Sequence, residues 1–353
     1  MTSSIVDFNP APLDMDAVLD PAWLSRVLAH RWPEARVREV TVVETLVTMA
    51  TKVRIRLTVE GNDDAPSQLC IKGILMPTGA PRSASIVETL FYRDAATTLG
   101  VHVPGCIHAA LAADGGSGVI VMDDQVAAGG TFCSALRPFN PDQARDGLEQ
   151  LAVLHAAGWE GKAVYASPWI PRFLDFMADS PLLPVDQLQA LLDGDRGKPL
   201  PAEIRNADRL HRGVVALSAQ IRERPNCLVH GDAHAGNIYR DASGALGIVD
   251  WQILQKGEWA QDVAYHLAAV LTPEDRRLHE KDLLDHYRAR LSALGGPRLD
   301  ADEAWTRYRA AMVYGFYLWA ITRKVDPAIT HEFVRRLGLA VSDLESFSIL
   351  RIS

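Results

Sequence analysis

The chain has few cysteines, no long uncharged apolar stretch and no excess of basic residues. Its four cysteines, Cys70, Cys106, Cys133 and Cys227, are far apart in the sequence and form no C-x-x-C pair. Disulfide frameworks belong to short, cysteine-rich chains and zinc sites to paired C-x-x-C motifs, so neither is indicated and we expect free thiols in a reducing compartment. A membrane-spanning helix is not expected either, because it would need about 20 consecutive apolar residues.

Basic residues are in the minority: 36 Lys and Arg stand against 44 Asp and Glu, for a formal net charge of -8. Nucleic acid and anionic lipid bind basic surfaces, so neither is an expected partner. The first sixteen residues show no basic start followed by an apolar core, which argues against a leader peptide. We therefore expect a cytoplasmic protein that acts on a small molecule, without membrane insertion. The sequence leaves its oligomeric state open.

The length of 353 residues favours two lobes, and 48% hydrophobic with 23% charged residues is typical of a globular enzyme. The first lobe is expected to be an antiparallel sheet with one inserted helix. Asp20 is a candidate N-cap for an earlier helix at 21–31. We expect strands at 37–46, 52–59 and 68–74, the inserted helix at 83–99, and a strand pair within 102–122.

Helical patterns dominate after the flexible residues 128–130, and we place the lobe boundary between Asp123 and Asp124. The fold class is thus α+β, with a lobe at 1–123 and a larger, mainly helical lobe at 124–353. Helices are expected at 142–158, within 181–201 and at 202–222. Two short apolar runs, 227–229 and 247–249, enclose a polar loop and a hairpin turn at 241–244. Further helices are expected to the end of the chain.

Two motifs carry the chemistry: HGDAHAGN at 230–237, and IVDWQ at 248–252. Phosphoryl transfer from ATP needs a carboxylate that orients and deprotonates the acceptor hydroxyl, and oxygen ligands that hold magnesium on the phosphates. Asp232 provides the carboxylate, and Asn237 and Asp250 provide the oxygens. Asp and Asn in loops often only cap turns, but order, spacing and strand context agree here.

This motif pair resembles the catalytic loop and metal-binding triplet of the protein-kinase-like superfamily, in its aminoglycoside phosphotransferase and choline kinase branch. The resemblance implies a two-lobed protein-kinase-like fold that uses ATP and Mg²⁺. It also implies that Asp232 is the catalytic base and that Asn237 and Asp250 bind the metal. The Asp250-Trp251-Gln252 triplet, together with DVAYHL at 262–267, looks closest to ecdysteroid-kinase-like proteins.

Lys72 lies in an otherwise apolar strand, where a lone ammonium needs an anionic partner. Glu88 on the following helix is the natural candidate. In the family that the motifs resemble, such a Lys binds the α- and β-phosphates and such a Glu holds the Lys. The alternative is a Lys that reaches water at a strand end and a solvated Glu.

The turn between the first two strands departs from the family, because residues 47–52 contain no glycine. Backbone N–H groups and the hydroxyls of Thr48 or Thr51 are then the candidates for phosphate contact, with an ordinary hairpin turn as the alternative. The resemblance also places adenine recognition on backbone groups of the lobe connector, at Met122, Asp123 and Asp124. The alternative for these three is a strand end with acidic turn residues.

The sequence thus predicts an ATP- and Mg²⁺-dependent kinase that phosphorylates a hydroxyl of a small molecule. The alternatives are a catalytically silent nucleotide-binding module, which the glycine-free loop favours, and an aminoglycoside- or macrolide-type antibiotic kinase. A hydrolase is not supported, since there is no G-x-S-x-G turn. A hydrophobic alcohol is one candidate acceptor, with plain core packing as the alternative, because aromatic and Met side chains recur at helical spacing near the C-terminus: Trp305, Tyr308, Met312, Phe316 and Trp319, with Tyr314 and Tyr317 opposite.

Overall fold

The computed structural model describes residues 9–77, 79–224 and 226–353. Its internal contacts divide the chain into two units. The first unit contains the residues up to Thr97, Val103–Thr131 and Asp241–Ala245, and the second contains Thr98–His102, Phe132–Arg240 and Leu246–Ser353. Because the first unit extends beyond Asp123, the boundary between 123 and 124 stays a proposal.

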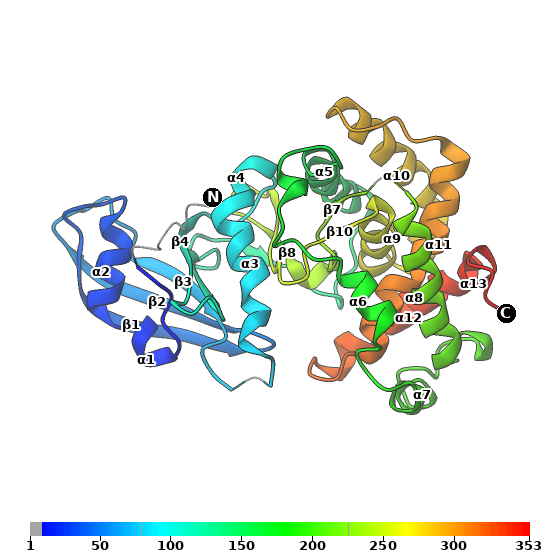
Figure 1. Ribbon diagram of the computed structural model, residues 1–353, viewed down its shortest axis with the longest axis horizontal. Helices are drawn as coiled ribbons and strands as arrows, with labels where there is room; N and C mark the ends of the chain where they lie inside the picture. The colour runs from blue at the N-terminus through cyan, green and yellow to red at the C-terminus, as the bar shows by residue number, and fades with distance from the viewer. Residues whose placement is uncertain (1–8, 78, 225) are drawn as a thin grey trace. The chain divides into compact units, whose positions relative to one another are not determined.

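The first unit is built on an antiparallel sheet with strand order β1-β2-β3-β5-β4 (Figure 1). The expected strands are all present, and Asp20 caps α2 by accepting from the N–H groups of Ala22 and Trp23. The elements are α1 (Met15–Val18), α2 (Pro21–Ala29), β1 (Arg36–Val47), β2 (Thr51–Glu60), β3 (Gln68–Gly73), η1 (Arg82–Ser85), α3 (Ile86–Leu90), η2 (Phe91–Ala95), α4 (Ala96–Leu99), β4 (Cys106–Leu111) and β5 (Gly118–Asp123).

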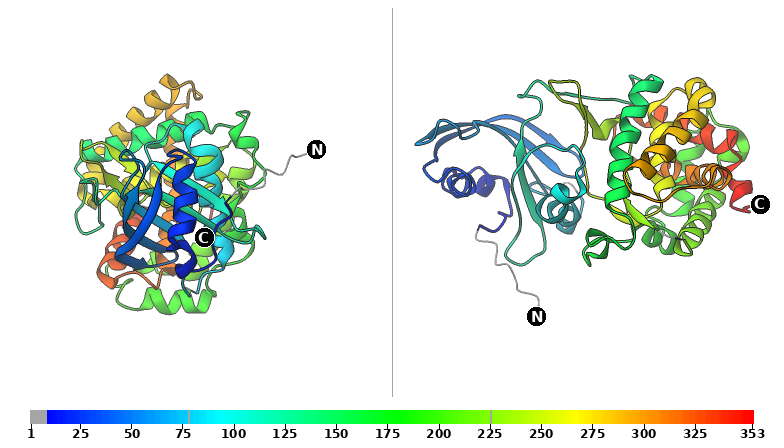
Figure 2. Two further views of the ribbon diagram at one scale, coloured as in Figure 1. Left: turned by 90° about the vertical axis from the view of Figure 1, so that its left-hand side faces the viewer. Right: turned by 90° about the horizontal axis from the view of Figure 1, so that it is seen from above.

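The helices α2 and α3 cover opposite faces of this sheet (Figures 1 and 2). Ile71 of β3 packs in the apolar core that α2 forms with the sheet, through Trp23 and Leu24. Neighbouring side chains of a strand point to opposite faces, so Lys72 points away from α2. It meets Glu88 of α3 on the other face. The sheet therefore separates an apolar core from the face that carries Lys72.

The helix expected at 83–99 is not one continuous α-helix. It begins with the 3₁₀ turn η1, continues as α3, passes through the π-helical segment η2 and ends as α4. A π-helical turn inserts an extra residue into the hydrogen-bond ladder, and such turns are frequent at functional sites. Sequence periodicity does not reveal the insertion, because buried apolar residues continue on both sides of it, with Leu90 before it and Ala96 and Leu99 after it.

The second unit is mainly helical, with two small sheets of order β10-β7 and β6-β8-β9, the strand β6 spanning the division between the units. Within the described ranges, none of its helices has both the length and the apolar character needed to cross a membrane. The elements are β6 (Thr131–Phe132), α5 (Pro141–Ala157), η3 (Val164–Ala166), α6 (Phe173–Asp179), α7 (Val185–Asp193), η4 (Ala202–Ile204), α8 (Ala207–Arg222), β7 (Cys227–Val229), η5 (Ala235–Asn237), β8 (Ile238–Arg240), β9 (Leu246–Ile248), β10 (Gln255–Gly257), α9 (Trp259–Val270), α10 (Pro273–Ala293), α11 (Ala301–Ile321), α12 (Pro327–Asp343) and α13 (Ser346–Ile349).

One expectation for this unit needs correction, and the others can be compared with the structure. The helix expected at 202–222 starts only at Ala207, because Asn206 caps it by accepting from the N–H of Arg209 at 2.8 Å. The two expected apolar runs are present as β7 and β9, and the expected turn at 241–244 joins β8 to β9, while β7 pairs with β10. On α11, Tyr314 and Tyr317 are as buried as the residues opposite them. The aromatic residues of α11 from Tyr308 onward are therefore core residues, as the plain-packing alternative predicted, and only Trp305 is partly exposed.

Candidate active site

The loop after β7 begins with a glycine that its backbone requires. Gly231 has φ +82°, a left-handed conformation that disfavours other residues, and a Cβ at this position would lie 2.6 Å from the carbonyl oxygen of Ile253. The sharp turn brings Asp232 out of the strand direction immediately after β7. This explains in physical terms why the motif places a glycine directly before the aspartate.

The side chain of Asp262 in α9 binds backbone groups of the same turn. Its carboxylate accepts from the N–H of His230 at 2.6 Å and from the N–H of Gly231 at 2.8 Å. His155 of α5 lies 3.2 Å from the same carboxylate, and its other ring nitrogen is 2.8 Å from the hydroxyl of Tyr287. All these groups are buried. Asp262 is therefore the anchor of the loop, a role that sequence reasoning did not assign to it.

Asp232 and Asn237 face each other across this loop. The side-chain nitrogen of Asn237 donates to the backbone carbonyl of Asp232 at 2.9 Å and to its Oδ2 at 3.0 Å. Burial would raise the pKa of Asp232, and the nearby Asp250 carboxylate acts in the same direction. The imidazoles of His234 and His230 outweigh both, so the pKa lies below its ordinary value. With 29% of its side chain exposed, Asp232 is an ionised carboxylate that an acceptor can reach.

Val249, which follows β9 and directly precedes Asp250, is hydrogen-bonded to Asn237 and so brings Asp250 close to it. The N–H of Val249 donates to the carbonyl of Asn237 at 2.9 Å, and His230 Nε2 lies 3.1 Å from the carbonyl oxygen of Val249. Asp250 itself has φ +68°. A non-glycine residue in this region costs free energy and is held there by its surroundings, which is typical of functional sites.

Two aromatic residues near Asp232 were not singled out as site residues from the sequence. Tyr265 of α9 donates its hydroxyl to Asp232 Oδ1 at 2.9 Å, and the indole N–H of Trp319 donates to the Tyr265 oxygen at 2.5 Å. Burial, and then the negative charge of Asp232, raise the pKa of Tyr265 far above its ordinary value, so it stays a donor. A tyrosine within an apolar helical pattern looks like core packing, and only the fold shows that it reaches the base.

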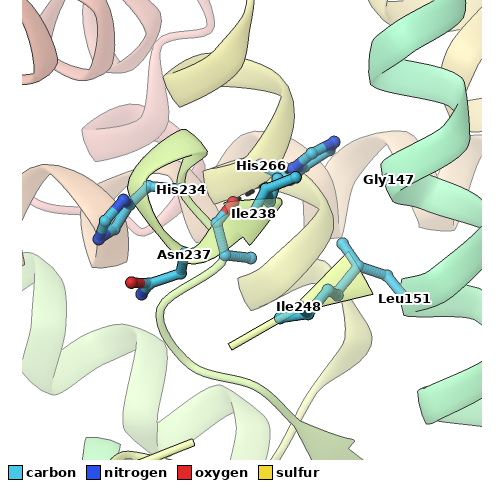
Figure 3. A pocket seen from close by; sticks show the side chains of 8 residues that line it. Gly147, Leu151, His234, Asn237, Ile238, Ile248 and His266 are labelled. Carbon is cyan, nitrogen blue, oxygen red and sulfur yellow. Dashed lines mark hydrogen bonds between the residues drawn. The ribbon is translucent and has the colours of Figure 1, made fainter. Parts of the chain in front are cut away.

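A small cavity lies behind the loop (Figure 3). Figure 3 shows the side chains of His234 and Asn237 pointing away from His266, whose ring nitrogens each lie 3.2 Å from a backbone carbonyl oxygen. Gly147 allows α5 to approach closely, because a Cβ there would lie 2.2 Å from the His266 ring. The close packing supports the loop from behind. The lining residues are Gly147, Leu151, Ala233, His234, Asn237, Ile238, Ile248 and His266.

In the first unit, Lys72 and Glu88 form the expected pair. The ammonium lies 2.9 Å from Oε1 and 2.7 Å from Oε2 of Glu88, and the two side chains are only 5% and 2% exposed. Such a buried pair is not a general source of stability, because desolvation of both charges offsets much of their attraction. The pair does, however, fix an ammonium in one position on this face of the sheet.

The two threonines of the β1–β2 turn lie in different surroundings. Thr48 is exposed, and its hydroxyl donates to the carbonyl of Ala50 at 3.2 Å. Thr51 is fully buried, and its hydroxyl has no hydrogen-bond partner among the described residues. Of the two, Thr48 is the better placed for contact with a ligand. Phosphate binding by either one stays a prediction.

The three residues of the predicted lobe connector, Met122, Asp123 and Asp124, also lie in different surroundings. Met122 is buried in the sheet opposite Cys70, and the N–H of Asp123 donates to the carbonyl of Gly105. Asp124 accepts from Arg54 Nε at 2.9 and 3.0 Å and from two backbone N–H groups of the next turn. Its carboxylate therefore holds the turn, and a role of these residues in adenine binding stays a prediction.

The oxygen donors in the second unit fit a magnesium ion. Mg²⁺ prefers hard oxygen ligands and is usually bound by one or two carboxylates plus substrate phosphates. Asp250 supplies a carboxylate, and the Oδ1 of Asn237 is the remaining amide atom once Nδ2 is bonded to Asp232. In the part of the chain that the structure describes, no cluster of three or more His, Cys, Asp or Glu side chains could hold a metal. Mg²⁺ does not need such a cluster, because substrate phosphates and water usually complete its coordination.

Solved structures with a similar fold include several kinases. A choline/ethanolamine kinase family protein from Mesorhizobium loti is 15% identical, with 94% of this chain and 98% of that chain covered and a TM-score of 0.50. A choline kinase from Streptococcus pneumoniae is 12% identical (88% and 94% covered, TM-score 0.49). The GDP complex of aminoglycoside 2'-phosphotransferase-IIIa is 14% identical (92% and 99% covered, TM-score 0.49). The first of these supports the expected protein-kinase-like fold.

Among curated proteins, no sequence matches this chain. The family model described as "Phosphotransferase enzyme family" matches residues 88–311, which is more than half of the chain. The match begins at Glu88 and includes the loop with Asp232 and Asn237, Asp250 and the anchoring Asp262. The antiparallel sheet, the helical second unit and this match agree with the resemblance seen in the motifs. The chain therefore belongs to the phosphotransferase enzyme family.

Proposed function

We propose that this phosphotransferase is an ATP- and Mg²⁺-dependent kinase that transfers the γ-phosphoryl group to a hydroxyl of a small molecule. The observation that carries the proposal is the arrangement of Asp232, Asn237 and Asp250 on one backbone-anchored loop and its neighbouring hairpin. An ionised, partly exposed carboxylate beside a pair of hard oxygen donors is the combination that phosphoryl transfer requires.

Each residue then has a defined task. Asp232 orients the acceptor hydroxyl and accepts its proton as the oxygen attacks the phosphorus. Lys72, held by Glu88, binds phosphate oxygens of the nucleotide. Asn237 and Asp250 would hold magnesium, which when bound neutralises charge on the phosphates. Positioning and charge stabilisation supply most of the rate, so fixed geometry at these residues matters more than their intrinsic reactivity.

The acceptor is a matter for experiment. Apart from Trp305, the aromatic residues of α11 are buried, so they give no support to a hydrophobic acceptor. The names of the similar structures suggest that choline, ethanolamine, an aminoglycoside and a macrolide belong in an acceptor panel. The closeness to ecdysteroid-kinase-like proteins stays a prediction, and sterols are included for that reason. A cytoplasmic location is likewise still a prediction.

The test is ADP release from Mg·ATP in the presence of the acceptor panel, with Asp232→Asn compared with the wild-type protein. We expect the variant to bind nucleotide normally and to lose turnover by about 100-fold or more, because it lacks the base. Asp142→Asn, which removes an exposed carboxylate, is the control and should leave turnover unchanged. Mg²⁺-dependent ATP binding without turnover in the wild-type protein would instead indicate a silent nucleotide-binding module.

A further inference from the structure

The carboxylate of Asp232 receives a hydrogen-bond donor on each of its two oxygens. The hydroxyl of Tyr265 donates to Oδ1 at 2.9 Å, and the amide of Asn237 donates to Oδ2 at 3.0 Å. A rotation of the carboxylate would break both bonds, and bonds to an ionised oxygen are among the stronger ones in proteins. The plane of the carboxylate is therefore fixed before any acceptor arrives.

The direction of the Tyr265 hydrogen bond is set by Trp319. An indole N–H is a donor only, so the Tyr265 oxygen must accept from it and direct its own hydrogen elsewhere. The remaining partner is Asp232 Oδ1. Tyr265 and Trp319 are 1% and 5% exposed, so water does not compete for these bonds. The chain of donors runs from Trp319 through Tyr265 to Asp232.

Trp319 also contacts His234, a further side chain that lies beside the Asp232 carboxylate. Its ring packs edge-on against His234, with centroids 5.0 Å apart, and lies at a tilt of 32° to the Phe333 ring, with centroids 4.1 Å apart. The Nδ1 of His234 accepts from the N–H of Gly236, which leaves Nε2 facing Asp232 Oδ2 at 3.5 Å. Trp319 thus supports the side chains on both sides of the carboxylate, from a helix about 85 residues later in the chain.

We propose that Tyr265 and Trp319 are positioning residues for the phosphoryl transfer, which hold the Asp232 carboxylate in the orientation that meets the acceptor hydroxyl. This inference rests on the proposed function of Asp232 as the base. Neither residue needs to touch the nucleotide or the metal: among the described residues, the Tyr265 hydroxyl bonds only to Asp232 and Trp319. Their removal should therefore lower kcat and leave the KM for ATP unchanged.

The experiment measures kcat and the KM for ATP from ADP release, once with the member of the acceptor panel that gives the fastest turnover and once with water as the only acceptor. Tyr265→Phe removes one hydroxyl and keeps the ring, and we expect kcat to fall by about 10- to 100-fold. Trp319→Phe keeps an aromatic ring but loses the N–H, and kcat should fall by a smaller factor. Both variants should keep the KM for ATP of the wild-type protein.

The matched control is Tyr308→Phe on α11. Tyr308 is also fully buried, and its hydroxyl donates to Glu280 at 3.0 Å, but it does not contact the loop. This variant should lose thermal stability and keep kcat. A Tyr265→Phe protein with wild-type kcat would overturn the inference. So would a loss of activity in Tyr265→Phe that only matches its loss of folded protein, measured by circular dichroism.

Failure of the proposed function gives a different result. In that case the wild-type protein releases no more ADP than Asp232→Asn, and the inference about Tyr265 and Trp319 falls with it. If the wild-type protein is active, Asp232→Asn is inactive and Tyr265→Phe is unaffected, the proposed function stands and only the positioning role is wrong. A drop in kcat in both aromatic variants at constant KM supports the role.

Discussion

The side-chain nitrogen of Asn237 lies 3.0 Å from Oδ2 of Asp232, which joins the proposed metal ligand directly to the proposed base. One amide group can therefore serve two purposes, with Nδ2 orienting the carboxylate and Oδ1 available to the metal. A substitution at Asn237 should affect both turnover and metal dependence.

Asn237→Asp separates these two purposes. The substitution keeps an oxygen for magnesium, removes the donor to Asp232 and adds a second negative charge beside it. We expect kcat to fall by about 100-fold while turnover still responds to Mg²⁺, because the base is no longer held in place. Initial rates over a magnesium titration measure both effects. Wild-type kcat in this variant would contradict a role of the amide nitrogen.

Lys72→Met tests the buried ion pair of the first unit. The substitution leaves the buried Glu88 carboxylate without this ammonium, and such a loss typically costs about 3–5 kcal/mol of unfolding free energy. Adding Glu88→Gln should recover part of the stability, because the buried charge is then gone. Lys72→Met and the Lys72→Met/Glu88→Gln double variant should both lack ATP turnover, because neither has the ammonium that binds the phosphates. Urea unfolding monitors stability, and equal stability of the single and double variants would argue against coupling between the two side chains.

Asp262→Asn tests the anchor of the catalytic loop. An amide can replace only one of the acceptor oxygens that receive the N–H groups of His230 and Gly231, and a buried unsatisfied donor costs about 1–3 kcal/mol. We expect lower stability to urea together with reduced kcat, since the loop that carries Asp232 loosens. Asp208→Asn on the exposed face of α8 is the control and should change neither quantity. An unchanged kcat in Asp262→Asn would remove the anchoring role.

Thiol reactivity should depend on pH in a way that follows from burial. Burial raises the pKa of Cys70 to about 11 and that of Cys106 to about 12. Only the thiolate is alkylated, so at pH 8 roughly one Cys70 side chain in a thousand is reactive. The alkylation rate at both cysteines should be low at neutral pH and rise about tenfold per pH unit up to pH 9.5. Peptide mass spectrometry after iodoacetamide treatment measures this, and rapid modification of Cys70 at pH 7 would contradict it.

The residues that the sequence could predict are those whose partners lie nearby in the chain or are required by charge. Asp20 caps α2 as its position suggests, and Lys72 pairs with Glu88 because a buried ammonium needs an anion. The loop from Asp232 to Asn237 is likewise a local motif with a local hydrogen bond.

The hydrogen bonds that could not be predicted from the sequence join segments that are far apart in the chain. Asp262 reaches the loop from a helix thirty residues later, and Trp319 reaches Tyr265 from α11. Periodicity shows that such residues are buried but not what they touch, because that depends on how the helices pack. For the same reason the sequence showed the apolar runs of β7 and β9 but not their partners, which are β10 and β8.

If the proposed function is right, this chain binds ATP through magnesium held at Asp250 and Asn237. The most direct test is the thermal shift produced by ATP with and without Mg²⁺, in the wild-type protein and in Asp250→Ala. We expect a rise in Tm that requires Mg²⁺ and shrinks in the variant, because a ligand that binds only the folded protein stabilises it more the tighter it binds. The absence of any shift in the wild-type protein, or an equal shift in Asp250→Ala, would contradict it.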